Sequence, residues 1–216
     1  MNSRRTCRVY VASMNLRGPR ASLGRACKKV NVTSAQAKKS KYRVAFSPMQ
    51  PLPGGYKEHD RFESYWQAGK VWKGIPHAVS VGWWKKQTTA KRRYPRGKGR
   101  RVLHAVFPGH PEPLDYVSAR KKVYVPEYHA IATGTETFKE LAAEAVARGP
   151  DGEPIVVYDF DGPRGADREP LCREVTVDLL RDKIADLSHP FGHGYVVAAA
   201  LLGIDPAEYC ADKNVP

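Results

Sequence analysis

Hydrophobic and polar residues recur along the chain in patterns that predict both strands and helices. Alternation or short apolar runs predict strands at residues 8–13, 42–47, 102–107, 123–126 and 154–160, the last of them central in a sheet. Helical periodicity predicts helices at residues 60–73, around Trp83 and Trp84, and at residues 137–148, 174–187 and 194–202. With no internal repeat and no low-complexity linker, the sequence predicts one α+β domain over residues 1–216, with helices clustered around a small mixed sheet.

Helix start and stop signals support several of these boundaries. Asp60 is a candidate N-cap for the helix at 60–73, and Thr135 or Thr137 for the helix that Gly149 and Pro150 end. Thr33 or Ser34 would likewise cap a helix over residues 35–39. The segment 194–202 is apolar on nearly all sides, so it is expected to be buried.

One helical segment, Arg61–Trp72, combines polar groups on a single face. At about 3.6 residues per turn, Glu63, Gln67 and Lys70 fall in register, and Trp66 lies beside them. Two interpretations remain open at this point. The first is an ordinary amphipathic helix whose charges face water, and the second is a catalytic helix that carries a proton-handling carboxylate near an amine.

Charge is distributed very unevenly along the chain. Residues 1–101 contain 25 Lys and Arg against 3 Asp and Glu, a net charge of +22, whereas residues 102–216 carry a net charge of −8. So basic a half is typical of proteins that bind phosphate groups, in nucleic acids, nucleotides or sugar phosphates. The alternative is a positively charged surface that has no dedicated partner.

The densest basic run lies at residues 91–101, where glycines and a proline predict a mobile loop rather than a helix. Tyr94 in this loop is predicted to stack on a base. Nuclear targeting or solubility would explain the charge equally well. The residues predicted to contact phosphate or nucleic acid, the first two in a turn after the first strand, are Arg17, Arg20, Lys91, Arg96, Lys98, Arg100 and Arg101.

Other sequence signals bear on location and cofactors. No apolar run approaches the ~18 residues that span a bilayer, and the basic N-terminus leads into no apolar signal region, so we expect an intracellular protein with no membrane partner. The four cysteines and seven histidines show no metal-ligand spacing, so neither a metal nor a cofactor is predicted. The oligomeric state is left open.

The pattern Glu63-x-Tyr65-x-Gln67-Ala68-x-Lys70, preceded by Phe46-Ser47 and a Pro/Gly loop, resembles the NADAR superfamily. Members of that family carry an aromatic–Ser segment followed by a helix with this pattern. The resemblance covers residues 44–101 and, weakly, 155–203. Ser64 stands where the family often has His, residues 103–149 correspond to an insertion, and the Trp-containing C-terminal turn of the family is not recognisable.

The resemblance implies N-glycosidase chemistry, the cleavage of the bond between a ribose carbon and an amine or base nitrogen. Described substrates of the family are phosphorylated riboflavin-pathway intermediates and ADP-ribose attached to guanine. Glu63 would stabilise an oxocarbenium-like centre, and Lys70, with a lowered pKa, would attack the anomeric carbon and form a Schiff base. The implied catalytic residues are Glu63, Lys70, Asp159 and Asp161. The implied substrate-binding residues are Phe46, Ser47, Tyr65, Trp66, Gln67, Arg92, Arg93 and His193.

A second motif points to different chemistry. The apolar strand that ends in Asp159-Phe160-Asp161-Gly162 resembles the first motif of haloacid-dehalogenase-type phosphatases, in which Asp159 would be the nucleophile and Asp161 the acid/base, with Mg²⁺. Only 55 residues follow Asp161, too few for the rest of that fold, and Pro163 replaces the usual Thr or Val. A structural or sugar-binding acidic turn is the favoured interpretation here.

The sequence therefore predicts an N-glycosidase-type hydrolase that acts on a phosphorylated ribosyl, nucleotide or nucleic-acid-linked substrate. The competing hypothesis is a non-catalytic DNA- or RNA-binding protein that uses residues 1–101 as a basic face.

Overall fold

The computed structural model describes the chain except for residues 1–5, 15, 17–22, 24–25, 35–39 and 212–216. It has an α+β architecture, as predicted, with a mixed four-stranded sheet and a separate pair of antiparallel strands. The chain divides into two compact units. We call residues 1–47 and 125–216 the sheet unit, and residues 48–124 the inserted unit.

The sheet has the strand order β2-β5-β1-β6. Its central strand β5 (Ile155–Asp159) pairs in parallel with β1 (Val9–Ser13) on one side and with β2 (Lys28–Asn31) on the other. The strand β6 (Cys172–Glu174) joins β1 antiparallel. Every residue of β5 is buried, as expected for a strand covered on both faces, so the strands predicted at 8–13 and 154–160 are confirmed.

The helices of the sheet unit are α1 (Lys41–Ala45), α5 (Val125–Thr133), α6 (Glu136–Arg148), α7 (Val177–Ala185), α8 (His193–Leu201) and α9 (Pro206–Cys210). The helix α8 packs against β5, β1 and α5, and eight of its nine residues are buried. An all-apolar helix needs such cover, which confirms the prediction for this segment. The side chain of Thr135 accepts a hydrogen bond from the Phe138 amide and caps α6, also as predicted.

The inserted unit contains α2 (Phe62–Ala68), β3 (Lys70–Trp72), α3 (His77–Lys85), the 3₁₀ turn η2 (Pro95–Gly97), β4 (Val102–Ala105), α4 (Tyr116–Ala119) and the π-helical turn η3 (Arg120–Tyr124). The strands β3 and β4 pair antiparallel, with Lys70 opposite Ala105. Aromatic rings form much of the core, where Trp66 stacks on Phe107 with ring centroids 5.5 Å apart.

The predicted helix over residues 60–73 is wrong beyond Ala68. Gly69 follows, and Lys70 lies in β3, so Glu63 and Gln67 keep their helical register but Lys70 does not continue it. The cause is tertiary, because a Cβ on residue 69 would lie 2.3 Å from the Phe107 ring, and β4 captures the backbone after it. The N-cap is Arg61 rather than Asp60, whose side chain pairs instead with the Arg61 guanidinium group.

Two segments predicted as strands are helical. Residues 41–45 form α1, because Ser40 caps its N-terminus and the Tyr42 and Phe46 rings stack one turn apart. Residues 123–126 lie in the helical run through η3 and α5. The wide π-helical turn of η3 lets this run continue past Pro126, which has no N–H to donate.

Smaller departures concern exposure and boundaries. The strand predicted at 102–107 is β4, but Val102 and Leu103 are exposed rather than buried. The helix predicted from residue 174 begins at Val177, capped by Thr176, because residues 172–174 pair with β1. Tyr94 is 2% exposed and packs against Trp83, so it is not presented to a base. The helix expected at 35–39 lies outside the described residues.

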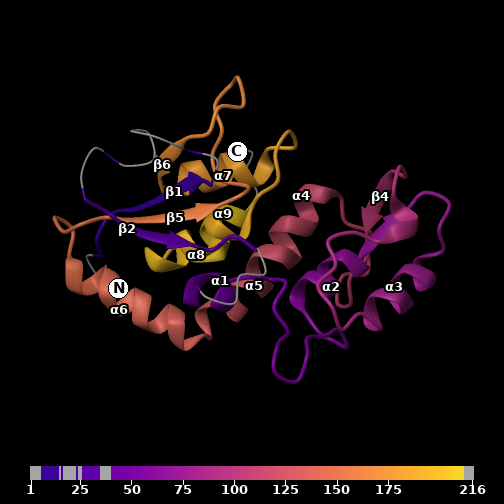
Figure 1. The fold of residues 1–216 in the computed structure, drawn as a ribbon. Coiled ribbons are helices and arrows are strands. Elements are labelled where there is room, and N and C mark those ends of the chain that lie inside the picture. The colour runs from indigo at the N-terminus through magenta and orange to yellow at the C-terminus, as the bar shows by residue number, and fades with distance from the viewer. Residues whose placement is uncertain (1–5, 15, 17–22, 24–25, 35–39, 212–216) are drawn as a thin grey trace. The chain divides into compact units, whose positions relative to one another are not determined.

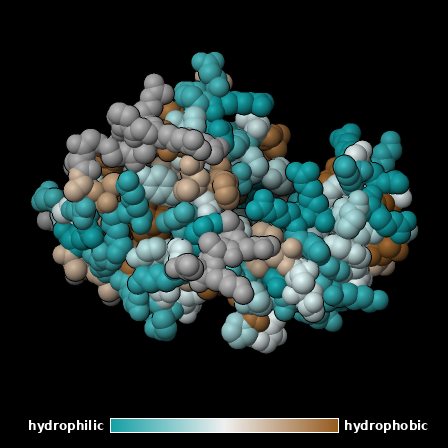
Figure 2. All heavy atoms as spheres, viewed as in Figure 1, coloured by the Kyte–Doolittle hydropathy of each residue, from teal (hydrophilic) through white to brown (hydrophobic). Residues whose placement is uncertain are grey.

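Three further observations concern the surface and the cysteines. No described helix is both long and apolar enough to cross a membrane. Hydrophilic side chains cover much of the visible surface (Figure 2). The four cysteines, Cys7, Cys27, Cys172 and Cys210, form no disulfide.

Candidate functional site

A cavity in the inserted unit surrounds Lys70. It has a volume of about 350 Å³, and most of its wall is apolar, formed by Trp66 on α2, Ala105 and Leu103 on β4, and Phe107. Tyr116 and Ala119 on α4 complete it, together with Val102 and His104. We call this cavity the Lys70 pocket. Lys70 lies in β3 and lines the same cavity as Trp66 on α2. The two residues are therefore close together, as the sequence predicted, but a strand rather than a helix places Lys70 there.

The ammonium group of Lys70 is desolvated. Burial lowers its pKa below the ordinary value, the negative charge of Glu63 opposes this effect, and the positive charge of Arg93 adds to it. The group makes no hydrogen bond or ion pair with another described residue, and it lies over the Trp66 ring, whose centroid is 5.9 Å from Nζ. An amine in such surroundings is neutral over a wider range of pH than an exposed lysine, and a neutral amine is nucleophilic.

Glu63 and Gln67 are coupled on α2. The Gln67 side-chain amide donates a hydrogen bond of 2.8 Å to Glu63 Oε1, one helical turn away. This bond fixes the position of the carboxylate whose charge acts on Lys70. Tyr65, also on α2, is 3% exposed, and its hydroxyl accepts a hydrogen bond of 3.3 Å from Lys57 Nζ. Trp66 is 8% exposed, and one face of it already stacks on Phe107.

Two residues that sequence reasoning missed hold α2 in place. The Arg61 guanidinium group is buried and donates hydrogen bonds to the carbonyl oxygens of Met49 and Thr88, at 2.8 and 2.9 Å. At the other end of α2, the ring of His77 contacts the Ala68 carbonyl oxygen through Nε2 at 2.9 Å, which satisfies a free carbonyl of the helix. Nothing in the local sequence marks either role, because each depends on segments far along the chain.

Phe107 is the third residue that the sequence did not single out. Its ring stacks on Trp66, approaches Tyr65 to 5.3 Å between centroids, and occupies the space that a side chain at position 69 would need. It also lines a second cavity of about 350 Å³ in the same unit, next to His59 and Lys85. The one signal in the sequence was Gly69 itself, because a glycine within a helical pattern can mark a place where another side chain comes close to the backbone.

In the sheet unit, Asp159 lies at the end of β5 and binds backbone groups with both carboxylate oxygens. Oδ1 accepts from the Phe160 amide at 2.7 Å, and Oδ2 accepts from the Gly194 amide at the N-terminus of α8 at 2.9 Å. The residue is 1% exposed. This carboxylate therefore acts as a cap for α8, where the helix dipole favours negative charge.

His193 completes this cluster. Its Nε2 donates to the Val32 carbonyl oxygen, since a ring nitrogen that faces a carbonyl must carry the proton. Its Nδ1 lies 3.3 Å from Asp159 Oδ2. We call Asp159, His193 and the Gly194 amide the Asp159 cluster.

The surroundings of the Asp159 cluster are tightly packed. A Cβ at Gly192 would lie 2.4 Å from Asp159 Oδ2 and 2.9 Å from Asp161 Cβ. Asp161, which the sequence proposed as catalytic, thus lies beside this cluster, half-buried. Phe46 and Ser47 are both buried in the sheet unit, where the Phe46 carbonyl oxygen accepts a hydrogen bond from the Tyr128 hydroxyl at 2.6 Å.

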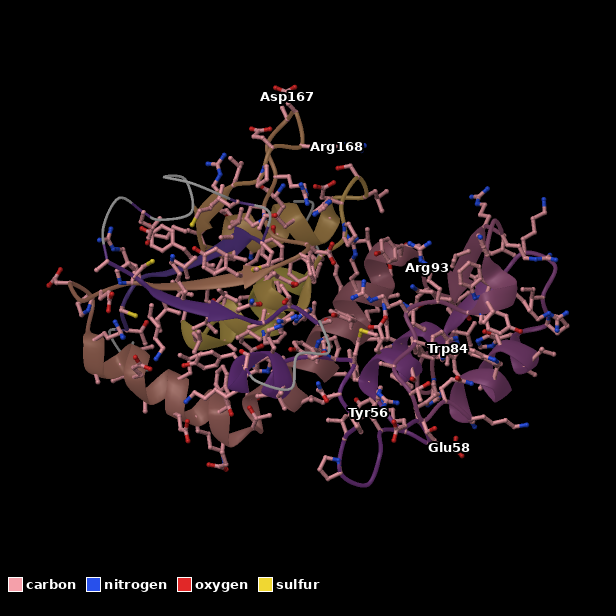
Figure 3. All side chains as sticks on the ribbon, viewed as in Figure 1. Tyr56, Glu58, Trp84, Arg93, Asp167 and Arg168 are labelled. Atoms are coloured by element: carbon pink, nitrogen blue, oxygen red, sulfur yellow. The ribbon has the colours of Figure 1, made fainter. Side chains whose placement is uncertain are left out.

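The basic run at residues 91–101 presents its charged side chains to solvent. All seven of its cations are exposed: Lys91, Arg92, Arg93, Arg96, Lys98, Arg100 and Arg101. None of them forms an ion pair with a residue that the structure describes, and Arg100 donates to the Lys73 carbonyl oxygen. Figure 3 shows Arg93 in the inserted unit. Arg17 and Arg20, predicted to receive phosphate, lie outside the described residues.

Comparisons with known proteins add no assignment. No protein-family model, no curated protein and no solved structure matches this chain. Among the described residues, no group of three or more His, Cys, Asp or Glu side chains is placed to hold a metal ion. The chemistry of the Lys70 pocket must therefore be argued from its own residues.

Proposed function

We propose that the protein is an N-glycosidase-type hydrolase that cleaves a carbon–nitrogen bond of a phosphorylated ribosyl, nucleotide or nucleic-acid-linked substrate. The observation that carries the proposal is the desolvated Lys70 amine at the wall of an apolar cavity, with the charge of Glu63 acting on it. A partly buried lysine without an ion-pair partner costs stability, and such groups concentrate at functional sites. The E-x-Y-x-Q-A-x-K pattern, typical of NADAR proteins, supports the same assignment.

In the proposed reaction, the Lys70 amine donates its lone pair to the anomeric carbon while the bond from that carbon to the base nitrogen breaks. The leaving nitrogen keeps the bonding pair, and Glu63 relays to it the proton that the new ammonium group releases. The ribose ring C–O bond then breaks, its oxygen takes a proton from water, and a protonated Schiff base and hydroxide result. Addition of water releases the sugar as its aldehyde and restores Lys70, so the net reaction is hydrolysis.

The other side chains of the pocket have supporting roles in this proposal. Gln67 holds Glu63 through their 2.8 Å hydrogen bond. The aromatic wall of Trp66 and Phe107 excludes water and offers apolar surface to a base or ribose. Arg93, whose positive charge lowers the Lys70 pKa, is exposed and positioned to attract a phosphate group of the substrate.

The test is a screen of ribosylated nucleotides and of ADP-ribosylated guanine in oligonucleotides for released base. Lys70→Ala and Glu63→Gln should each abolish turnover while the far-UV CD spectrum is retained. Lys73→Ala, an exposed lysine three residues further on, is the matched control and should turn over normally. Full activity in Lys70→Ala would exclude Lys70 as the nucleophile.

Borohydride reduction tests the covalent step separately. With a substrate that is turned over, reduction should leave a sugar adduct on the peptide that contains Lys70, and the Lys70→Ala protein should carry none. Turnover without any trapped adduct would remove the Schiff base from the mechanism and leave Glu63 as a direct stabiliser of the oxocarbenium centre.

A second candidate function rests on the basic run. Seven exposed cations within residues 91–101 make a surface suited to the phosphates of DNA or RNA. If binding is the function, replacing Arg92, Arg93, Arg100 and Arg101 with Gln should reduce the slope of log Kd against log salt by about 3. In that case Lys70→Ala and Glu63→Gln would leave binding unchanged.

A further inference from the structure

The largest cavity among those described lies in the sheet unit and contains none of the residues discussed so far. Its volume is about 760 Å³, within the range of pockets that hold small ligands. The loop between β5 and β6 contributes Arg164 and Arg168 to its lining. Lys183 on α7 also lines it, as do Asp186, Ser188 and His189 in the connection from α7 to α8. We call it the Arg164 pocket.

The charges that face this cavity are mainly positive. Arg164, Arg168 and Lys183 are cations, and the one carboxylate on the wall is Asp186. The charge of Asp186 is already engaged, because it accepts hydrogen bonds from the Ser188 amide and hydroxyl, and Lys183 Nζ lies 3.6 Å away. These bonds hold its pKa below the ordinary range, so it stays ionised and keeps Lys183 in place.

This concentration of cations is not a by-product of a generally basic surface. Residues 102–216 carry a net charge of −8, and the whole pocket lies within them. The loop also carries three acidic residues, Asp161, Asp167 and Glu169, that do not line the cavity. Figure 3 shows Asp167 at the tip of the loop, the Glu169 carboxylate accepts from the Asp167 amide at 3.1 Å, and Asp161 lies beside Gly192. Three cations therefore line the cavity with Asp186 as its one carboxylate.

The loop that carries the arginines is held in a defined conformation. Arg168 has φ of +60°, a left-handed conformation that costs a residue with a side chain about 1 kcal/mol or more. Arg164 Nη1 donates to the Arg168 carbonyl oxygen at 3.1 Å, and the Gly165 amide donates to the Glu169 carbonyl oxygen at 3.0 Å. A Cβ at Gly165 would collide with the Glu169 carboxylate. The backbone that carries the two arginines is thus held in a defined conformation.

We propose that the Arg164 pocket binds a phosphate-bearing ligand of nucleotide size. Two arginines and a lysine that line one cavity suit the oxygens of a phosphate, to which arginine can bind in a bidentate way. The cavity volume leaves room for more than the phosphate itself. This inference is independent of the reaction proposed for Lys70.

ADP, inorganic pyrophosphate and adenosine serve as probes, each titrated into the full chain by calorimetry at ~0.15 M salt, where exposed charges are well screened. ADP and pyrophosphate should bind and adenosine should not. The double variant Arg164→Gln/Arg168→Gln should weaken ADP binding about tenfold or more. The matched control, Arg8→Gln/Arg173→Gln, removes two exposed arginines of the same unit that do not line the pocket and should change Kd less than about twofold.

Further variants separate the possible failures. Lys70→Ala should bind ADP normally, which distinguishes this pocket from the proposed catalytic one. Arg168→Gln alone alters an exposed side chain and serves if the double variant fails to fold. Absence of ADP binding to the unaltered protein, or equal losses in the double variant and its control, would overturn the proposal.

Discussion

The Lys70 pocket and the Asp159 cluster each withdraw an ionisable group from solvent, but only the cluster supplies that group with hydrogen-bond partners. Asp159 accepts hydrogen bonds from two backbone amides and faces His193, so both of its oxygens have partners in the fold. The Lys70 ammonium group has an aromatic ring beside it and a pKa that burial lowers. A buried polar group whose hydrogen bonds are made is a structural device, whereas a desolvated amine beside a cavity is available for chemistry. The comparison favours Lys70 over Asp159 as a reactive group.

The largest expected effect tests the structural half of this comparison. Asp159→Ala removes the cap of α8 and leaves the Gly194 amide and His193 without their buried partner. We expect a loss of about 3–5 kcal/mol in the free energy of unfolding, measured by far-UV CD in urea. Asp167→Ala, at the exposed tip of the β5–β6 loop, is the control and should cost less than about 0.5 kcal/mol. Wild-type stability in Asp159→Ala would show that the cluster does not hold α8.

The next effect concerns the packing that forms the Lys70 pocket. Gly69→Ala would place a Cβ 2.3 Å from the Phe107 ring, so the ring must move. We expect a cost of about 1–3 kcal/mol, as for other overpacked cores. Tryptophan fluorescence is a suitable measurement, because all four tryptophans, Trp66, Trp72, Trp83 and Trp84, belong to the inserted unit. Gly69→Ala/Phe107→Leu should recover part of the loss, and a double variant no better than Gly69→Ala would place the strain elsewhere.

The limits of the sequence can be understood from the same two regions. The central strand at 155–159 and the buried helix α8 were predictable, because four or more consecutive apolar residues leave few alternatives. The end of α2 was not, because it is set by Phe107 and by β4, more than thirty residues away. The spacing therefore predicted that Glu63, Gln67 and Lys70 share a helical face. In the structure the pocket is lined by Trp66 of α2, Lys70 of β3 and residues between 102 and 119.

The acidic turn shows a different limit. The residues Asp159 and Asp161 marked a strand end correctly, but a sequence pattern cannot show whether a carboxylate faces a ligand or a backbone amide. In the structure Asp159 faces the N-terminus of α8, thirty-five residues further along. The Arg164 pocket escaped notice for a related reason. Its cations lie in an acidic half of the chain, where the charge distribution predicted no anion site.

The desolvation of Lys70 can be tested by the pH dependence of the free energy of unfolding. Because folding lowers the Lys70 pKa, the unfolded chain binds more protons than the folded one between the folded pKa and the usual value near 10.5. The contribution of Lys70 to stability therefore rises with pH through that interval and is least favourable below it. Lys70→Met should stabilise the inserted unit by about 1 kcal/mol at neutral pH, and the difference from wild type should shrink as pH rises.

Urea unfolding followed by tryptophan fluorescence at several pH values measures this difference. Lys73→Met, at an exposed lysine, is the control and should not alter the pH dependence. His59, whose pKa burial also lowers, is present in every variant and cancels in the subtraction. A pH-independent difference between wild type and Lys70→Met would show that the amine is not desolvated.

The smallest expected effect is the change in the Lys70 pKa when a neighbouring charge is removed. The Arg93 charge lowers the Lys70 pKa and the Glu63 charge raises it, so Arg93→Gln should move that pKa up and Glu63→Gln should move it down. The Lys70 ¹³Cε signal, assigned by its absence in Lys70→Met, reports this titration directly by NMR. Since Arg93 is exposed, its effect on the Lys70 pKa should fade at high salt. The effect of Glu63, which is half-buried and is the larger of the two charge effects, should persist. If both pKa shifts respond equally to salt, water reaches Lys70 freely. The contrast between a desolvated Lys70 amine and the hydrogen-bonded carboxylate of Asp159 would then lose its physical basis.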